Sequence, residues 1–332
     1  MHRLHPLKQN SRPCFLRLLV LACVVVLAGC AQTFDLQSHR GGRGLMPENT
    51  LAAFRHALEM GVTTLELDIA ITADGVPVIS HEPALNPVLT RDAQGRWIKE
   101  PGPLIKSLTL VQVQSFDVGR ADPGTAYGRQ FQQQQASDGE RIPTLASLFK
   151  LVKDLGASDV RFDIETKIFP NKPGDTLGPE AFVNTLLPVI RDAGMAKRVM
   201  LQSFDWRTLQ LVQKLEPGME TVYLTVQTPN SDNLRDGSWT AGLLLKDHAS
   251  VAHMVKASGG TTWAPLHNNL DAAAVKAAQQ LGLKVIPWTV NEAADLDRLI
   301  SWGVDGIISD YPDRLRDAMR RAGMPLPRGT QR

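Results

Sequence analysis

Cysteine is nearly absent from this chain of 332 residues, and the three cysteines, Cys14, Cys23 and Cys30, all lie in its first thirty residues. The remainder has no thiol for a disulfide, so its stability must come from packing. Aromatic residues make up only 6% of the chain, and 36 Lys and Arg oppose 34 Asp and Glu without forming a basic block. Base stacking and phosphate neutralisation are therefore poorly supported, and we expect no nucleic-acid partner. Small-molecule chemistry is the better expectation.

Long apolar runs are also rare, and the longest is Leu16–Ala28 near the start of the chain, which only Arg17 interrupts. Four basic residues, Arg3, Lys8, Arg12 and Arg17, accompany it. The run is shorter than the roughly 20 residues that a membrane-spanning helix needs. A positive leader followed by a short apolar segment is typical of an export signal.

The apolar run ends in Leu27-Ala28-Gly29-Cys30, which resembles the lipobox of bacterial lipoproteins. We therefore predict a lipoprotein signal peptide over residues 1–29, a lipidated Cys30, and an exported domain over residues 30–332 that is held to the membrane only by this anchor. Ala31 stands where an Asp would resemble an inner-membrane retention signal, which favours the outer membrane and a site facing the periplasm. An ordinary signal peptide with an incidental cysteine is the alternative.

Beyond Gln32, short apolar runs alternate with amphipathic stretches, a pattern typical of α/β proteins with parallel strands. Strands are predicted over residues 35–38, 64–71, 76–80, 160–165, 199–204, 220–226, 261–265, 284–290 and 306–309. Helices are predicted over residues 49–60, 144–155, 180–193, 206–215, 271–281, 293–302 and 312–322. About eight strand-helix units indicate a (β/α)8 TIM barrel.

An open, doubly wound sheet is the alternative fold. The glycine-rich segment 39–44 follows the first predicted strand, but it lacks the spacing of a dinucleotide-binding turn and does not open directly into a helix. Residues 83–106 and 118–142 interrupt the strand-helix alternation. We expect these two segments to be insertions in the loops after the early strands, where they would shape or cover a site.

Two carboxylates share one face of the predicted strand 64–71, because side chains alternate along a strand and Glu66 and Asp68 are two residues apart. Their repulsion would be relieved by a hard cation such as Ca²⁺ or Mg²⁺. A solvated strand face is the alternative. A two-residue turn at Asp74-Gly75 would set His81 directly opposite Asp68 and so bring an imidazole to the acids.

The predicted strand near residues 160–165 repeats the pattern. Asp163, Glu165 and Lys167 share one face, so a further acid and a cation reach the end of a second strand. A salt bridge between strands would explain the charges, but it would not explain why carboxylates recur at the carboxyl ends of strands. In a TIM barrel this end carries the active site.

Two histidines and a further cation complete the set. His39 and Arg40 follow the first predicted strand and therefore reach the same rim as His81. Imidazoles that flank a metal suit general acid and base roles. Arg40 and Lys167 can hold an anionic group. Together these side chains describe metal-assisted phosphoryl chemistry.

In order and spacing, the same residues resemble the glycerophosphodiester phosphodiesterase family. The matching motifs are His39-Arg40-Gly41, Pro47-Glu48-Asn49-Thr50, Glu66-x-Asp68, Asp74-Gly75, Val78-x-x-His81, Glu165-x-Lys167, Gln202-Ser203-Phe204, Trp288-Thr289-Val290-Asn291 and Asp305-Gly306-Ile307-Ile308-Ser309-Asp310-Tyr311-Pro312. The resemblance covers essentially the whole chain after the predicted signal. Glu82 follows His81 where the family commonly has Asp.

The resemblance implies a TIM barrel that hydrolyses glycerophosphodiesters, a small-molecule substrate class, to glycerol 3-phosphate and an alcohol. It also implies attack by the substrate's own glycerol hydroxyl, which gives a cyclic phosphate that water then opens. The implied site residues are Glu66, Asp68 and Glu165 as ligands of one divalent cation, Ca²⁺ or Mg²⁺, His39 and His81 as the general acid and base, and Arg40 and Lys167 on the phosphate.

Two other functions compete with this one. A phospholipase acting on intact lipid headgroups would need an apolar loop that enters the bilayer, and neither 83–106 nor 118–142 is apolar enough. A non-catalytic lipoprotein that binds a partner at the surface would have no need of the acids, histidines and cations.

Four further residues have structural interpretations, and three of them have a functional interpretation as well. Asn49 fits the N-cap of the helix that begins near it, and Glu48 has either a structural role or one in supporting the metal ligands. Trp263 and Trp288 either pack the barrel, which we expect, or line its pocket.

Overall fold

All nine of the predicted strands occur in one sheet in the computed structural model, which describes residues 1–3 and 33–330. The strands are β1 (Asp35–Ser38), β2 (Thr64–Ile71), β3 (Pro77–Ile79), β4 (Arg161–Thr166), β5 (Val199–Ser203), β6 (Glu220–Thr225), β7 (Thr262–Pro265), β8 (Lys284–Val285) and β9 (Gly306–Ser309). Apart from residues 1–3, the predicted signal peptide lies outside the described residues, as does Cys30.

The sheet closes on itself. Parallel neighbours follow the order β8-β7-β6-β5-β4-β2-β1-β9, and β3 pairs with β2 outside this path. The two ends are joined by hydrogen bonds from Asp305 N to Val285 O (2.9 Å) and from Val290 N to Ile308 O (3.0 Å). The prediction of a (β/α)8 TIM barrel is therefore confirmed. In β8 the regular ladder stops short of the predicted residue 290, since Pro287 has no amide hydrogen to donate.

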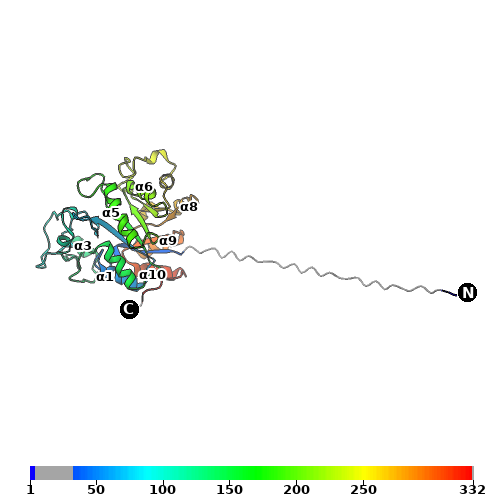
Figure 1. The fold of residues 1–332 in the computed structure, drawn as a ribbon, viewed down its shortest axis with the longest axis horizontal. Coiled ribbons are helices and arrows are strands. Elements are labelled where there is room, and N and C mark those ends of the chain that lie inside the picture. Colours follow the sequence, from blue (N-terminus) through cyan, green and yellow to red (C-terminus); the bar gives the residue numbers. More distant parts are fainter. Residues whose placement is uncertain (4–32, 331–332) are drawn as a thin grey trace. The chain divides into compact units, whose positions relative to one another are not determined.

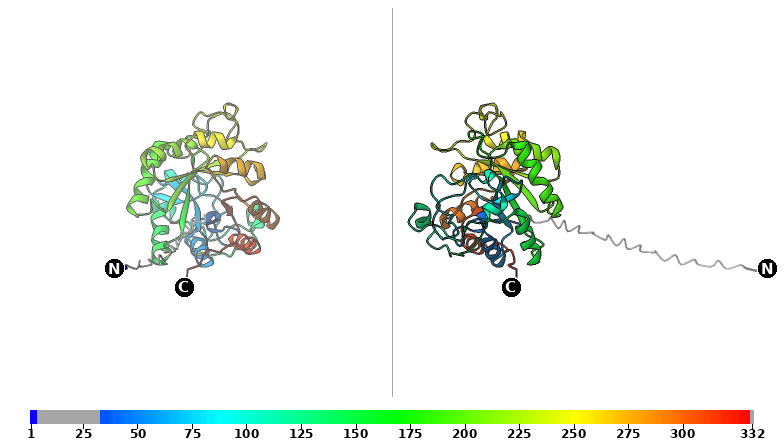
Figure 2. Two further views of the ribbon diagram at one scale, coloured as in Figure 1. Left: turned by 90° about the vertical axis from the view of Figure 1, so that its right-hand side faces the viewer. Right: turned by 60° about the vertical axis from the view of Figure 1, so that its left-hand side comes forward.

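Helices surround the strands on the outside of the barrel (Figures 1 and 2). They are α1 (Leu51–Met60), α2 (Leu110–Val113), α3 (Ala126–Gln130), α4 (Leu145–Asp154), α5 (Pro179–Asp192), α6 (Trp206–Leu215), α7 (Val251–Ala257), α8 (Ala272–Gln280), α9 (Ala293–Ser301) and α10 (Pro312–Arg321). Short 3-10 turns lie at η1 (His39–Gly41), η2 (Ile105–Ser107), η3 (Leu245–Asp247) and η4 (His267–Asn269). Helices α2, α3 and α7 are not among the predicted helices. Within residues 33–330, none of the helices has both the length and the apolar character that crossing a bilayer requires.

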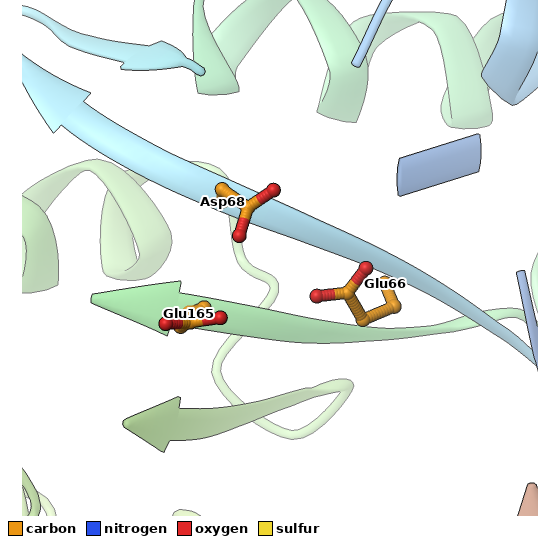
Figure 3. Close-up of side chains that lie close together, drawn as sticks. All are labelled: Glu66, Asp68 and Glu165. Atoms are coloured by element: carbon orange, nitrogen blue, oxygen red, sulfur yellow. The ribbon is translucent and has the colours of Figure 1, made fainter. Parts of the chain in front are cut away.

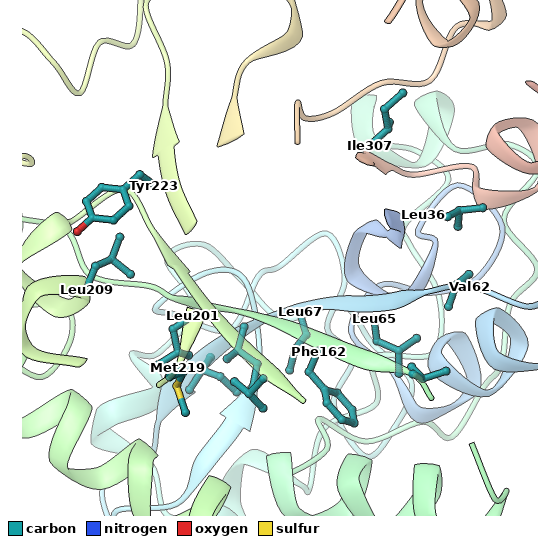
Figure 4. Packing of buried hydrophobic residues seen from close by; sticks show 14 of the residues in the cluster. Leu36, Val62, Leu65, Leu67, Phe162, Leu201, Leu209, Met219, Tyr223 and Ile307 are labelled. Atoms are coloured by element: carbon teal, nitrogen blue, oxygen red, sulfur yellow. The ribbon is translucent and has the colours of Figure 1, made fainter. Parts of the chain in front are cut away.

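The main core lies between the strands and the helices (Figure 4). Side chains of β2 and β4 alternate, so Leu65, Leu67 and Phe162 belong to this apolar layer. Phe162 is completely buried and meets Phe149 of α4 edge to face, with ring centroids 4.9 Å apart. The alternate side chains are polar, and this is the set that carries the acids.

The hairpin of β2 and β3 departs from the predicted register. Ile69 pairs with Ile79, and Ser80 N donates to Asp68 O (2.9 Å), so Ser80 and not His81 lies opposite Asp68. The predicted pairing was therefore wrong by one residue.

The error comes from the length of the turn. Thr72 N donates to Val76 O (3.1 Å) and Gly75 N donates to Thr72 O (3.0 Å), which leaves three residues in the loop instead of two. Gly75 has a φ of 77°, as the last residue of such a loop requires. His81 lies two residues beyond the end of β3, where strand alternation no longer fixes its direction.

The two predicted insertions, residues 83–106 and 118–142, both lie in the connection from β3 to α4, as expected. A second, smaller apolar cluster anchors them to the barrel and contains Leu85, Ile105, Val113 and Ile142. A further irregular segment, residues 226–250 between β6 and α7, was not anticipated.

Replacing Phe162 by Ala tests the packing of the main core. We expect the free energy of unfolding to fall by about 3–5 kcal/mol, because a large buried ring leaves a cavity. Denaturant titration would measure this change. Val111→Ala is the control, since Val111 is 80% exposed and its loss should cost less than about 0.5 kcal/mol. Equal losses in both variants would contradict this account of the core.

Candidate active site

Three carboxylates meet inside the barrel at the carboxyl ends of two neighbouring strands. Asp68 of β2 is in register with Glu165 of β4, and Glu66 lies one step earlier on the same face of β2. Oxygens of Glu66, Asp68 and Glu165 all lie within 4.8 Å of one another, and all three residues are buried (Figure 3). The sequence-predicted acids are thus brought together.

The charge states of the three acids differ. Burial, followed by the neighbouring Asp68, raises the pKa of Glu66 well above its usual value. Burial likewise raises the pKa of Glu165 to about 7. Burial also opposes the ionisation of Asp68, but the charges of His81, Arg40 and Lys167 outweigh it and lower the pKa of Asp68. A concentration of buried negative charge is therefore only partly compensated by the protein itself.

The donor set fits a hard cation. Three carboxylates from two adjacent strands offer oxygen ligands, which Ca²⁺ and Mg²⁺ prefer. Asp68 Oδ1 is buried and faces Lys167 Nζ at 3.7 Å, but it accepts no hydrogen bond. Within residues 33–330, the three acids form the group of His, Cys, Asp and Glu side chains with metal-binding spacing.

Arg40 lies against these acids through both its backbone and its side chain. Its φ of 51° belongs to the left-handed region, and its N–H donates to Glu66 Oε2 (2.8 Å). The guanidinium donates to Glu48 Oε1 (2.9 Å) and lies 3.3 Å from Asp68 Oδ2. Burial opposes its charge, but these carboxylates raise the pKa of Arg40, so the side chain stays cationic.

Lys167 supplies a second buried cation just beyond β4. Its Nζ donates to Glu165 Oε1 (2.7 Å). Burial again disfavours the charge, and the nearby Glu165 and Asp68 outweigh it and raise the pKa of Lys167. The two predicted phosphate-binding residues therefore both lie at the acids.

His39 is held from the side away from the acids. Its Nδ1 lies 2.5 Å from Asp310 Oδ1, and its Nε2 lies 3.9 Å from Glu66 Oε2. Asp310 follows β9 and is also bound by Arg43 Nε (2.7 Å) and Asn291 Nδ2 (2.8 Å). Burial, although opposed by Asp310, lowers the pKa of His39 to about 4.

His81 follows β3 and lines the same cleft as Glu165 and Lys167, although its predicted pairing with Asp68 is not the one observed. Its Nδ1 lies 2.8 Å from Glu82 Oε1. Burial lowers the pKa of His81, and the cations Arg40 and Lys167 lower it further, while Asp68 acts in the opposite direction. The Glu at position 82 thus contacts the His81 ring.

Several residues support the acids in ways that the sequence did not predict. Gln202 of β5 donates to Glu66 Oε1 (2.7 Å), and Asn49 Nδ2 donates to Asp68 Oδ2 (3.0 Å). Tyr127 of the second insertion donates to Glu48 Oε2. The motifs at Asn49, Gln202 and Asp310 are visible in the sequence, whereas Tyr127 lies in an insertion without a motif.

Asn49 does not have the role expected for it. Thr50 caps α1 instead, with its Oγ1 accepting a hydrogen bond from Ala53 N (3.1 Å). Asn49 has a φ of 57° and directs its amide to Asp68. Glu48 supports the site through Arg40, which favours the second of its two interpretations.

Comparison with known proteins agrees with this geometry. The model of the glycerophosphoryl diester phosphodiesterase family matches residues 39–314. A glycerophosphodiester phosphodiesterase of Caldanaerobacter subterraneus subsp. tengcongensis is 30% identical over 286 residues, which cover 86% of this chain and 98% of that protein.

Solved structures give the same result. A protein of Silicibacter pomeroyi, assigned as a glycerophosphoryl diester phosphodiesterase, superposes with a TM-score of 0.80 at 34% identity, covering 89% of this chain and 95% of that one. An Oleispira antarctica phosphodiesterase, solved with its product sn-glycerol-3-phosphate, has a TM-score of 0.62 at 22% identity, covers 86% and 96% of the two chains, and shows the shared fold. This chain belongs to the glycerophosphoryl diester phosphodiesterase family and is, like its relatives, a phosphoric diester hydrolase.

Proposed function

We propose that the barrel hydrolyses glycerophosphodiesters to glycerol 3-phosphate and an alcohol, with one divalent cation, Ca²⁺ or Mg²⁺, held by Glu66, Asp68 and Glu165. The observation that carries this proposal is the meeting of three buried carboxylates with two cations and two imidazoles at one rim of the barrel. The Oleispira antarctica structure holds sn-glycerol-3-phosphate, which supports the product class. A pure binding protein would have no use for this costly set of buried charges.

The cation would supply charge that the protein lacks. Bound at the three carboxylates, it would neutralise them and polarise a phosphoryl oxygen of the substrate. The remaining work falls to side chains of the chain. Arg40 and Lys167 stay charged at the rim and would hold the anionic phosphodiester close to the acids.

The two histidines would move protons. An ionised Asp310 only accepts hydrogen bonds, so the short contact to His39 places the hydrogen on Nδ1 and leaves Nε2 directed toward the acids as a base. Glu82 orients His81 in the same manner. One histidine would take the proton of the attacking glycerol hydroxyl and the other would protonate the leaving alkoxide, which gives a cyclic phosphate that water then opens.

Activity and metal binding test the ligand set together. The purified domain should release glycerol 3-phosphate from glycerophosphocholine, and a chelator should abolish the release until Ca²⁺ or Mg²⁺ is restored. Glu66→Gln and Glu165→Gln should each weaken metal binding, measured by calorimetry, by more than the roughly 10- to 100-fold typical of residues that only support ligands.

Asp163→Asn is the matched control for these variants. Asp163 is a buried carboxylate on the same strand as Glu165, two residues earlier, and it is outside the metal-binding group. Its variant should keep the metal affinity. Unchanged affinity in the Glu66 and Glu165 variants, or activity that survives chelation, would refute the shared site.

The roles of the histidines can be separated by the leaving group. His39→Ala and His81→Ala should each lower kcat for glycerophosphocholine by on the order of 10²–10⁴-fold. In the p-nitrophenyl diester of glycerol 3-phosphate, the leaving group is p-nitrophenolate, a stable anion that needs no proton. The variant that lacks the general acid should therefore recover most of its lost kcat on this substrate. The other variant should not recover, because the attacking hydroxyl still needs its base.

His56→Ala is the control for both histidine variants, because His56 lies on α1 and outside the described contacts of the acids. Near-native kcat in either His39→Ala or His81→Ala would show that the ring is structural. Equal losses on both substrates in both variants would refute the division into acid and base.

The anchor and the location belong to this proposal as well. We propose that residues 1–29 are removed and that Cys30 carries the lipid, with the enzyme held at the outer membrane and facing the periplasm. Fractionated cells should retain the native protein with membranes, while Cys30→Ser should be released or left unprocessed, since the attachment depends on acyl chains. Equal membrane recovery of both forms would overturn the anchor.

A further inference from the structure

A wide cleft of about 650 Å³ opens from the site toward the loops that follow β4 to β8. His81, Glu165 and Lys167 line it on the side of the acids. A substrate whose phosphate lies at Lys167 can therefore extend one of its two alcohol groups into this cleft. The volume of the cleft is far larger than that of a glycerol unit.

Four aromatic rings line the cleft, each from a different loop. Phe169 and Trp239 meet edge to face with centroids 6.2 Å apart, and Phe204 and Trp288 do so at 5.3 Å. All four are partly exposed, so ring surface remains open to a ligand. Trp288 both lines the cleft and packs, as expected, against the apolar cluster of Met200, Val222, Leu224 and Ala264. Trp263 is buried as expected.

The aromatic lining begins next to the phosphate-binding cation. Lys167 Nζ lies 6.0 Å from the centroid of the Phe169 ring, within the range of a cation–π contact. A ligand that follows the cleft outward from Lys167 therefore meets aromatic faces first.

Acidic side chains from a later part of the sequence also line this cleft. Asp232 and Asp236 belong to the segment 226–250, and Arg235 lies between them. Hydrogen bonds from Ser238 lower the pKa of Asp236, so it is ionised at neutral pH. Aromatic faces together with a net negative outer lining are the environment that a bulky cation prefers.

Resting on the diesterase function above, we propose that the cleft takes the alcohol half of the substrate and selects a quaternary ammonium headgroup of the choline type. A trimethylammonium group spreads its charge over methyl surface and donates no hydrogen bond, so aromatic faces can replace its water. A primary ammonium would lose hydrogen bonds that these rings cannot return. An acyl chain would have to lie beside the carboxylates of Asp232 and Asp236, which disfavours it.

Three diesters separate charge from shape, and the choline and dimethylbutyl esters among them are matched in size. We would measure kcat/KM for glycerophosphocholine, for glycerophosphoethanolamine, and for the ester of 3,3-dimethylbutanol, in which an uncharged tert-butyl group replaces the trimethylammonium. Glycerophosphocholine should exceed each of the others by about 3- to 30-fold, the range expected for cation–π recognition of a partly desolvated charge.

Two variants assign that preference to the cleft. Trp239→Leu should reduce the ratio of the choline ester to the dimethylbutyl ester toward one, and the double variant Asp232→Asn, Asp236→Asn should reduce it while sparing the shape of the cleft. Matched controls are Trp302→Leu, whose ring instead faces Arg298, and Asp297→Asn, which pairs with Arg321 at the surface. Both controls should keep the ratio.

The outcomes distinguish this inference from the function on which it rests. Equal kcat/KM for the choline and dimethylbutyl esters, or a ratio that survives Trp239→Leu, would overturn the headgroup assignment while the diesterase stands. Preference for lysophosphatidylcholine over glycerophosphocholine would give the cleft to an acyl chain and overturn it as well. If none of the diesters is cleaved with Ca²⁺ or Mg²⁺ present, the proposed function itself would be refuted.

Discussion

The removal of three neighbouring carboxylates from water dominates the design of this barrel. Glu66, Asp68 and Glu165 lie within 4.8 Å of one another and are buried. Leaving such charges unpaired would cost more than a domain's net stability can bear. Arg40 and Lys167 compensate them in part, and protonation relieves the rest, as the raised pKa values of Glu66 and Glu165 indicate. A divalent cation would complete the compensation and use the same charges for chemistry.

Two of the three non-glycine residues with positive φ within residues 33–330 lie where this compensation is made. Arg40 and Asn49 have φ values of 51° and 57°, a region that residues other than glycine rarely adopt. Each conformation serves an acid, since Arg40 N donates to Glu66 and the Asn49 amide donates to Asp68. Asn49 N also donates to Arg40 O (2.9 Å), so the two strained residues support each other. The surrounding hydrogen bonds hold conformations that would cost roughly 1–3 kcal/mol each alone.

The parts of the site that follow strand periodicity were predictable from the sequence. Alternation along β2 and β4 places Glu66, Asp68 and Glu165 on one face, and parallel strands bring their ends together. The position of His81 depended on the turn length, and a three-residue loop in place of a two-residue turn shifted the register by one. His81 nevertheless lines the same cleft as Glu165, because it lies beyond the end of β3, where the register of the strand no longer fixes its direction.

Contacts between distant loops could not be predicted in this way. Asp310 is 271 residues from His39 in the chain, and Tyr127 reaches Glu48 from an insertion with no regular pattern. Trp239 meets Phe169 only because the segment 226–250 folds over the rim. Local sequence periodicity does not predict these contacts, because they depend on closure of the barrel and on loop conformations that are determined by tertiary packing.

The rim therefore divides into two regions with different physical characters. Around His39, ion pairs and short hydrogen bonds join β1, β9 and the second insertion through Asp310, Arg43 and Glu48, which fixes the reacting groups. Beyond Glu165, loops after β4 to β8 contribute partly exposed rings and few ion pairs to the cleft. Catalysis requires groups held to within a fraction of an ångström, whereas recognition of a headgroup requires a surface of the right shape and charge. Placing the acids on β2 and β4, at the junction of these regions, lets one set of buried charges serve the phosphate while the alcohol is selected by residues that the chemistry does not constrain.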